Sequence, residues 1–215
     1  MRVRDVMTSN VITIPSDTPV LEAERILEFH KFERLPVVDK GKLVGLVTKD
    51  TLLKATPSSA TALSRGELLY LLSKLTVKDI MKKNVVTVSP DTSIEQATAM
   101  AQAKKVGCLP VVEGERVVGI LTTNDIFYKI LNPLFGIGEA GRRIIIHEAG
   151  EVEQMQKVLE AVQKADIYIK TLWTIRPLEA AKPDLILHLE AEEVSQLLSK
   201  LKKMGFSVEL REHIP

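Results

Sequence analysis

The chain contains an internal repeat, and this repeat constrains the fold more than any other feature of the sequence. Residues 3–55 align with residues 77–129 without a gap, at a constant offset of 74 residues, and 17 of the 53 aligned pairs are identical. The longest shared run, Leu35-Pro36-Val37-Val38, aligns with Leu109-Pro110-Val111-Val112. Two copies are too few for a solenoid. We therefore expect two similar units related by a pseudo-twofold axis.

Each copy has the pattern of a small unit that mixes helices and strands. In copy one, the β-branched run 11–14 predicts a short strand, and apolar residues spaced three and four apart over 20–27 predict the buried side of a helix. The runs 35–38 and 43–47 predict two further strands, and a second helix is expected to follow Thr48. Copy two repeats this order, so the expected fold class is α/β in both copies.

Two helix starts are marked by specific residues. Thr18 is expected to cap the first helix of copy one, with Pro19 at the first helical position. In copy two, Thr92 and Glu95 have the spacing of a capping box, in which each side chain bonds the other residue's backbone N–H.

Beyond residue 142 the pattern changes, and a separate C-terminal unit is expected. Its predicted strands are 143–147, 166–175, 184–189 and 206–210, and its predicted helices are 151–165 and 192–204, with Gly205 ending the last one. The resulting order, βαββαβ, is the ferredoxin-like motif.

These patterns divide the chain into four parts. We expect repeat one at 1–60, repeat two with a connecting helix at 61–132, a glycine-rich linker at 133–142 and the C-terminal domain at 143–215. Within the first two parts, residues 56–61 are expected to form a polar loop and residues 67–75 the connecting helix.

Composition excludes several classes of protein. Hydrophobic residues make up 45% and charged residues 27% of the chain, and the formal net charge is +1, so neither a nucleic-acid surface nor an acidic tail is expected. No apolar run is long enough to span a membrane, and the N-terminus lacks a signal-peptide pattern. The single cysteine, Cys108, cannot form an internal disulfide, so a reducing, cytoplasmic location is expected.

The repeat resembles the CBS domain, the cystathionine-β-synthase-type module, as a tandem pair over about residues 1–132. Three motifs carry this resemblance: an h-x-T opening strand, an L-P-V-V strand, and G-h-h-T-x-x-D before the last helix. They are found as Val11-Ile12-Thr13, Leu35-Pro36-Val37-Val38 and, in copy two, Gly119-Ile120-Leu121-Thr122-Thr123-Asn124-Asp125. The resemblance implies a cleft between the copies that binds an adenosine nucleotide.

The C-terminal part is similar to an ACT domain, a regulatory module that binds ligands and dimerises. Residues His147-Glu148-Ala149-Gly150-Glu151-Val152 resemble that family's D-x-P-G-x-L turn, with Gly150 retained and with His147 and Ala149 in place of Asp and Pro. A CBS pair followed by an ACT domain resembles the acetoin-utilisation, AcuB-like family of regulatory proteins.

The segment Thr122-Thr123-Asn124-Asp125 is the strongest candidate site. A hydroxyl and free backbone N–H groups at a helix start can hold phosphate. A carboxylate three residues later, on the same side of the helix, can accept hydrogen bonds from the two vicinal hydroxyls of a ribose. The alternative is that Thr122 simply caps the helix.

The CBS resemblance implies further binding residues. The adenine is expected against the following residues of copy two: Val85, Thr87, Gly107, Cys108, Leu109 and Pro110. The residues of copy one expected to bind nucleotide are Thr13, Pro36 and Thr48, with Lys31 and Arg34 placed to meet phosphates. The alternative for the basic residues is that they complement a helix dipole. Thr51 stands where the ribose-binding Asp is expected, so we expect fewer than two equivalent sites per chain.

Other motifs give little support for enzymatic chemistry. Residues 136–141 spell G-x-G-x-x-G, but a helix is predicted before them and a strand after them, the reverse of a dinucleotide site. The four histidines are scattered without metal-binding spacing, and no nucleophile elbow is present. We therefore expect no metal, no required cofactor and no catalytic residues.

The sequence thus predicts a regulatory protein rather than an enzyme. Its CBS pair is expected to bind AMP, ADP or ATP as a regulatory ligand and to change the dimer or the ACT-like domain. A homodimer and an unidentified protein partner are expected. The alternatives are an interaction scaffold with vestigial pockets, and a sensor of another adenosyl ligand such as S-adenosylmethionine or NADH.

Overall fold

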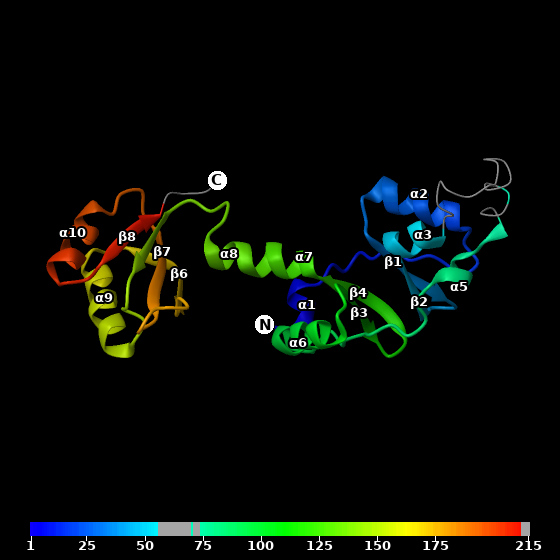
Figure 1. The fold of residues 1–215 in the computed structure, drawn as a ribbon, viewed down its shortest axis with the longest axis horizontal. Coiled ribbons are helices and arrows are strands. Elements are labelled where there is room, and N and C mark those ends of the chain that lie inside the picture. The colour runs from blue at the N-terminus through cyan, green and yellow to red at the C-terminus, as the bar shows by residue number, and fades with distance from the viewer. Residues whose placement is uncertain (56–69, 71–73, 212–215) are drawn as a thin grey trace. The chain divides into compact units, whose positions relative to one another are not determined.

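The structure is a computed structural model that describes residues 1–55, 70 and 74–211. Two compact units, Met1–Ile126 and Phe127–Pro215, make up the chain (Figure 1). The predicted loop at 56–61 lies outside the described residues, as does most of the predicted helix at 67–75. Within the described residues, no helix is long and apolar enough to cross a membrane.

The N-terminal unit contains the two copies, and each element of copy one has a counterpart in copy two. Copy one comprises α1 (Val3–Val6), α2 (Val20–His30), β1 (Arg34–Asp39), β2 (Lys42–Thr48) and α3 (Lys49–Ala55). Copy two comprises α5 (Val77–Ile80), α6 (Ile94–Lys104), β3 (Cys108–Glu113), β4 (Arg116–Thr122) and α7 (Thr123–Ile126).

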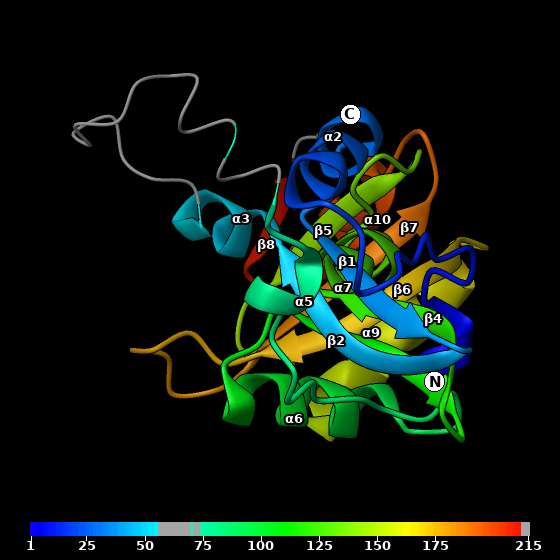
Figure 2. The same cartoon turned by 90° about the vertical axis from the view of Figure 1, so that its right-hand side faces the viewer.

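The equivalence of the copies extends to irregularities of the backbone. Strands β1 and β2 form an antiparallel hairpin whose register shifts between Val37 and Val38, and β3 and β4 form one whose register shifts between Val111 and Val112. In copy one, α2 and α3 lie beside the hairpin (Figures 1 and 2). A buried cluster that includes Leu27, Leu35 and Leu52 joins these elements.

The predicted opening strand at 11–14 does not form a strand. Within the run 11–14 only Ile14 forms a bridge, parallel to Val37, and in copy two the corresponding Val88 bridges Val111. The short β-branched run therefore adds a single bridge to the hairpin, because only its last residue lies next to a hairpin strand.

Both predicted helix caps are wrong by one residue. Helix α2 begins at Val20 with Pro19 as its N-cap, and no side chain caps it. Helix α6 is capped by Ser93, whose hydroxyl accepts a hydrogen bond from Gln96 N at 3.2 Å. Thr92 instead uses its hydroxyl to accept from Ser89 N at 3.2 Å, which closes the preceding turn.

The short helix before each copy attaches to the other copy. In α1, Val3 N donates to Thr92 O at 2.9 Å, and in α5, Val77 N donates to Thr18 O at 2.9 Å. Val77 is completely buried in the core of copy one. The two copies are therefore related by a pseudo-twofold arrangement in which each leading helix crosses to the opposite copy.

The C-terminal unit begins with helical residues rather than a linker. A π-helix (Phe127–Leu131) and α8 (Asn132–Phe135) follow α7 directly, and Gly136 ends α8 in the left-handed conformation with φ of 62°. The segment 133–142, predicted to be a linker, therefore starts inside α8 and ends on the first residue of a strand, Arg142. The helix predicted before the glycines therefore extends to Phe135.

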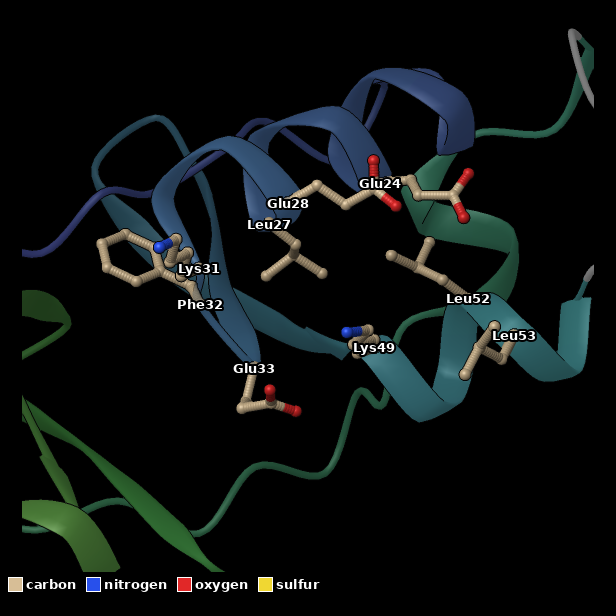
Figure 3. A pocket seen from close by; sticks show the side chains of 9 residues that line it. All are labelled: Glu24, Leu27, Glu28, Lys31, Phe32, Glu33, Lys49, Leu52 and Leu53. Carbon is tan, nitrogen blue, oxygen red and sulfur yellow. The ribbon is translucent and has the colours of Figure 1, made fainter.

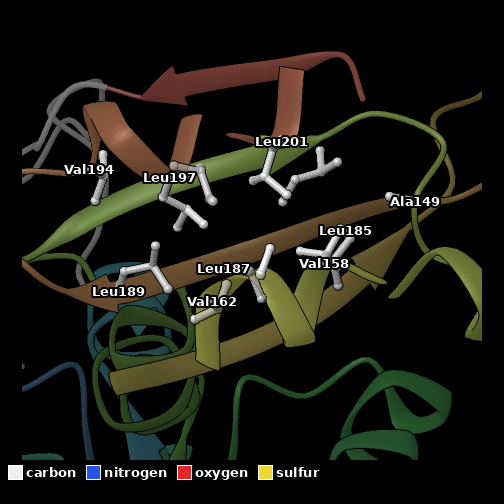
Figure 4. Close-up of a cluster of buried hydrophobic side chains, with 12 residues drawn as sticks. Ala149, Val158, Val162, Leu185, Leu187, Leu189, Val194, Leu197 and Leu201 are labelled. Atoms are coloured by element: carbon white, nitrogen blue, oxygen red, sulfur yellow. The ribbon is translucent and has the colours of Figure 1, made fainter. Parts of the chain in front are cut away.

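The rest of this unit is a four-stranded antiparallel sheet with two helices. In chain order its elements are β5 (Arg142–Ile146), α9 (Val152–Lys164), β6 (Tyr168–Ile175), β7 (Asp184–Glu190), α10 (Ser195–Lys203) and β8 (Val208–Arg211). The strand order in the sheet is β6-β7-β5-β8. Both helices pack on the same core, where Val158 of α9 and Leu201 of α10 meet Leu187 of β7 (Figure 4).

Candidate functional site

A cavity of about 320 Å³ in the N-terminal unit is the candidate site, and both copies line it. Copy one supplies its opening segment, the end of α2 and the start of β1. Copy two supplies the end of β4 and the start of α7. The lining residues are Thr8, Asn10, Val11, Ile12, Lys31, Phe32, Glu33, Arg34, Pro36, Ile120, Thr122, Thr123, Asn124 and Asp125.

Asp125 lies at the centre of a small hydrogen-bond network. Its Oδ2 accepts from the backbone N–H of Thr122 at 2.9 Å and from the Thr122 hydroxyl at 2.6 Å. Its backbone N–H donates back to that hydroxyl at 3.2 Å. Its Oδ1 accepts from the Thr8 hydroxyl of the opposite copy at 3.0 Å. The side chain therefore caps the helix and lines the cavity at the same time, although the residue is only 6% exposed.

Copy one forms the same helix cap without a carboxylate. The two hydroxyl oxygens of Thr48 and Thr51 lie 2.7 Å apart, and Thr51 N donates to the Thr48 hydroxyl at 3.2 Å. Thr48 N in turn donates to the Thr51 hydroxyl at 3.4 Å. A hydroxyl is therefore sufficient for the capping geometry, and the negative charge at Asp125 needs another explanation.

Two basic side chains line the same cavity. Lys31 ends α2 in the left-handed conformation with φ of 54°, and Arg34 begins β1 three residues later. Neither side chain forms an ion pair or a hydrogen bond with another side chain in the described parts of the chain. Glu33 lines the cavity between them. The site thus has positive charge at the α2–β1 junction and negative charge on Glu33 and on Asp125.

The structure brings only some of the predicted site residues together. Those that line the cavity are Thr122, Thr123, Asn124, Asp125, Lys31, Arg34 and Pro36. Those that do not are Thr13, Thr48, Val85, Thr87, Gly107, Cys108, Leu109 and Pro110. Cys108 and Leu109 are buried, and Cys108 packs with Leu46 and Ile120.

The crossing of the chain explains this division. Thr8 pairs with Ile120 through two backbone hydrogen bonds of 2.9 Å, which place the opening segment of copy one beside the end of β4. The acid at residue 125 therefore faces the opening segment of copy one rather than that of its own copy. Sequence reasoning missed Thr8, and the only available signal was that its counterpart in copy two is Lys82.

A second cavity of about 290 Å³ lies between α2 and α3 and shares residues 31–33 with the first one. Leu27 and Leu52 form its apolar floor, and charged side chains such as Glu28 and Lys49 surround it (Figure 3). The two cavities thus adjoin at residues 31–33, which link α2 to β1.

The G-x-G-x-x-G run of residues 136–141 does not lie between a strand and a helix, as a dinucleotide site requires. Gly136 ends α8, and β5 begins after Gly141, so the G-x-G-x-x-G run joins a helix to a strand. All three of its glycines have positive φ, which indicates a tight connection. In the described residues, no group of three or more His, Cys, Asp or Glu side chains has the geometry of a metal site.

Comparison with known proteins identifies the family of the N-terminal unit. The profile of the CBS domain matches residues 3–58 and 77–132, slightly more than half of the chain. The chain belongs to the CBS-domain family. A CBS domain-containing protein of Dictyostelium discoideum is 32% identical over 137 residues, which cover 61% of this chain and 94% of that protein.

Several other relatives are much longer than the shared region. An inosine-5′-monophosphate dehydrogenase of Korarchaeum cryptofilum is 32% identical over 142 residues, which cover 66% of this chain but 27% of that enzyme. An L-aspartate semialdehyde sulfurtransferase of Methanocaldococcus jannaschii is 32% identical over 126 residues, which cover 58% of this chain and 22% of that enzyme. The chain therefore spans about a quarter of the length of these relatives.

Solved structures resemble the same region. A putative acetoin utilization protein, AcuB, from Vibrio cholerae has a TM-score of 0.53 and 28% identity, covering 61% of this chain and 91% of its own. The CBS-pair protein CBSX2 from Arabidopsis thaliana has a TM-score of 0.53 and 29% identity, covering 61% and 94%. A structure of CBSX2 in complex with AMP has a TM-score of 0.50 and 30% identity, covering 61% and 96%.

Proposed function

We propose that the N-terminal unit is a regulatory module that binds one adenine nucleotide in the cavity beside Asp125. One observation carries the proposal: three charged positions that differ between the copies, Asp125, Arg34 and Glu33, line the same cavity, and the first two have the chemistry that a nucleotide needs. Asp125 corresponds to Thr51, and Arg34 corresponds to Cys108. Asp125 and Arg34 line the described cavity, whereas their counterparts carry neither a carboxylate nor a guanidinium.

The chemistry of the cavity fits a phosphorylated nucleoside. A carboxylate accepts well from the two vicinal hydroxyls of a ribose, and a guanidinium binds phosphate with two parallel hydrogen bonds. Asp125 would hold the ribose, and Arg34 with Lys31 would hold the phosphate. Ile12, Pro36 and other apolar lining residues offer a surface for a flat base. The AMP complex of the similar protein CBSX2 supports this ligand class.

We propose only one such site per chain. The pseudo-symmetric position would have Thr51 for the ribose and Cys108 for the phosphate, and neither residue offers a carboxylate or a guanidinium. AMP, ADP and ATP are the candidate ligands, and no further cofactor is proposed.

We propose further that the C-terminal unit is an ACT-like, ferredoxin-like domain that responds to the bound nucleotide. Its order βαββαβ and antiparallel strand order β6-β7-β5-β8 support this proposal. At the turn that resembles the ACT motif, Gly150 packs so closely against Pro183 that a Cβ would lie 2.8 Å from two Pro183 atoms. Only glycine fits such an approach. A regulatory, non-enzymatic role in a cytoplasmic homodimer completes this proposal.

The test replaces Asp125 with the residue that copy one uses. Asp125→Thr keeps a hydroxyl for the helix cap, as in the Thr48–Thr51 pair, and removes the carboxylate together with the hydrogen bond that Oδ1 accepts from Thr8. Hydrogen bonds to a charged group contribute about 1.5–3 kcal/mol, so AMP affinity measured by calorimetry should fall about 10- to 150-fold. The melting temperature of this variant without ligand should fall slightly, because the hydrogen bond from Thr8 is lost.

The matched control is Asp50→Asn, which removes an exposed carboxylate from α3 of copy one. This variant should bind AMP as the wild type does. Equal AMP binding by Asp125→Thr and the wild type would show that the ribose is not held there.

A ligand panel separates the proposal from its alternatives. At a hundredfold excess over Kd, a ligand stabilises the folded protein by about 2.7 kcal/mol, which raises the melting temperature measurably. A shift with S-adenosylmethionine or NADH but not with AMP, ADP or ATP would favour a different adenosyl sensor. No shift with any of the five at millimolar concentration would favour an interaction scaffold.

A further inference from the structure

We propose that Gly107 is a positioning residue for Arg34, in that the absence of a side chain at Gly107 leaves the space in which the Arg34 guanidinium lies. A Cβ built on Gly107 would be 3.1 Å from Nη1, 3.4 Å from Nη2 and 3.7 Å from Cζ of Arg34. The proposal rests on the phosphate-binding role proposed above for Arg34.

The backbone itself does not require glycine at this position. Gly107 is not among the glycines with positive φ, so any residue can adopt its conformation. Its counterpart in copy one is Glu33, which carries a long side chain at the same place in the fold. Gly107 differs from Glu33 in that the guanidinium of Arg34 lies where its side chain would be.

Gly107 is also tied to the wall of the nucleotide cavity. Its carbonyl accepts from the backbone N–H of Thr123, a cavity-lining residue at the start of α7, at 3.2 Å. In copy one the matching bond joins Lys49 N to Glu33 O at 3.0 Å. Because this bond forms in both copies whatever the side chain, it fixes the backbone of Gly107 beside the cavity.

The guanidinium is placed by shape rather than by a counter-charge. In the described ranges of the chain, Arg34 forms no ion pair and no side-chain hydrogen bond with another side chain. An incoming phosphate therefore needs to break no existing pair. A methyl group at residue 107 would displace the guanidinium by a few tenths of an ångström and misalign a two-bond contact whose strength depends on its geometry.

The experiment compares AMP with adenosine, which lacks the phosphate, by calorimetry on the full chain. The wild type should bind AMP more tightly, and Arg34→Ala should lose most of this preference. Gly107→Ala should lower the ratio of AMP to adenosine affinity about threefold, and Gly107→Val about tenfold or more, since a bidentate contact is orientation-dependent. Adenosine affinity should be unchanged in the two Gly107 variants, since Gly107 does not line the cavity.

The double variant Arg34→Ala/Gly107→Ala separates positioning from general damage. If Gly107 acts through Arg34, adding Gly107→Ala to Arg34→Ala should change the ratio no further. An unchanged ratio in both Gly107 variants, while Arg34→Ala loses it, would overturn the inference and leave the proposed function intact. The same fall in ratio with and without Arg34 would also overturn it. A wild type without preference for AMP would instead refute the phosphate role of Arg34.

Discussion

Two glycines at equivalent positions each leave room for a methionine side chain of the opposite copy. The side chain of Met81 occupies the space where Gly45 would carry a Cβ, and the side chain of Met7 does the same at Gly119. Met7 and Met81 are the C-cap residues of α1 and α5, the short helices that cross to the opposite copy. Neither glycine has positive φ, so the repeated glycine is explained by packing rather than by a turn.

Gly119→Ala should therefore destabilise the protein. Inserting a methyl group into an occupied site costs about 1–3 kcal/mol, because Met7 must move. Urea unfolding would measure the loss. The same substitution in a Met7→Ala background should cost less, since the obstructing thioether is gone. An equal cost in both backgrounds would contradict this explanation.

Single residues also show which parts of the cavity lining can be anticipated from the sequence and which cannot. Asp125 could be singled out because the order T-x-x-D at a helix start has a chemical meaning. Its neighbours could not be deduced, because both copies carry the same motifs. Which copy faces Asp125 depends on the pairing of Thr8 with Ile120, a contact between segments 112 residues apart that no local pattern encodes.

At the scale of elements, the predicted hairpins and the predicted helices within the described residues are present, because their apolar patterns match buried faces. The failures occur where two local solutions compete. Thr92 and Ser93 both offer a hydroxyl next to the start of α6, and Ser93 caps the helix while Thr92 closes a turn. The run 11–14 favours a strand by residue type, but only Ile14 finds a partner.

The attachment of α1 to copy two predicts a dependence on pH. Arg2 donates to Asp91 Oδ1 at 2.6 Å, and Arg4 donates to the same oxygen. The hydrogen bond from Arg2 is the main cause that holds the pKa of Asp91 below its usual value. A carboxyl group with a lowered pKa stabilises the folded state above its unfolded pKa, about 4, and loses that contribution as the pH falls through its folded value.

Asp91→Asn should therefore lower the urea midpoint at pH 7, and the difference from the wild type should shrink as the pH approaches 3. The counterpart in copy one, Asp17, forms no ion pair in the parts of the chain that the structure describes, so Asp17→Asn is the matched control and should show no such trend. A pH-independent difference for Asp91→Asn would mean that these arginines contribute nothing to the attachment.

At the scale of the whole molecule, the helix that carries Asp125 is followed directly in the chain by the first helical residues of the C-terminal unit. Helix α7 carries Asp125, and the π-helix after it begins at Phe127, where the two compact units divide. Within the C-terminal unit, α8 follows the π-helix and contacts the sheet, since the Thr171 hydroxyl donates to Leu134 O at 3.0 Å. In a π-helix each hydrogen bond spans five residues rather than the four of an α-helix, so one extra residue is inserted. Such segments occur often at functional sites.

This connection predicts how the two units respond to AMP in a calorimetric melt. Two compact units should give two unfolding transitions, one for each unit. AMP should raise the midpoint temperature of both, because a ligand that prefers one arrangement of the segment from α7 to α8 also biases the C-terminal unit. Deleting Tyr128, which is 62% exposed, would remove one residue, equal to about 100° of helical rotation, from the segment between Asp125 and α8. In this variant AMP should still raise the midpoint temperature of the N-terminal unit but no longer that of the C-terminal unit. If AMP leaves the midpoint temperature of the C-terminal unit unchanged in the wild type as well, the effect of AMP is not transmitted through the segment from α7 to α8.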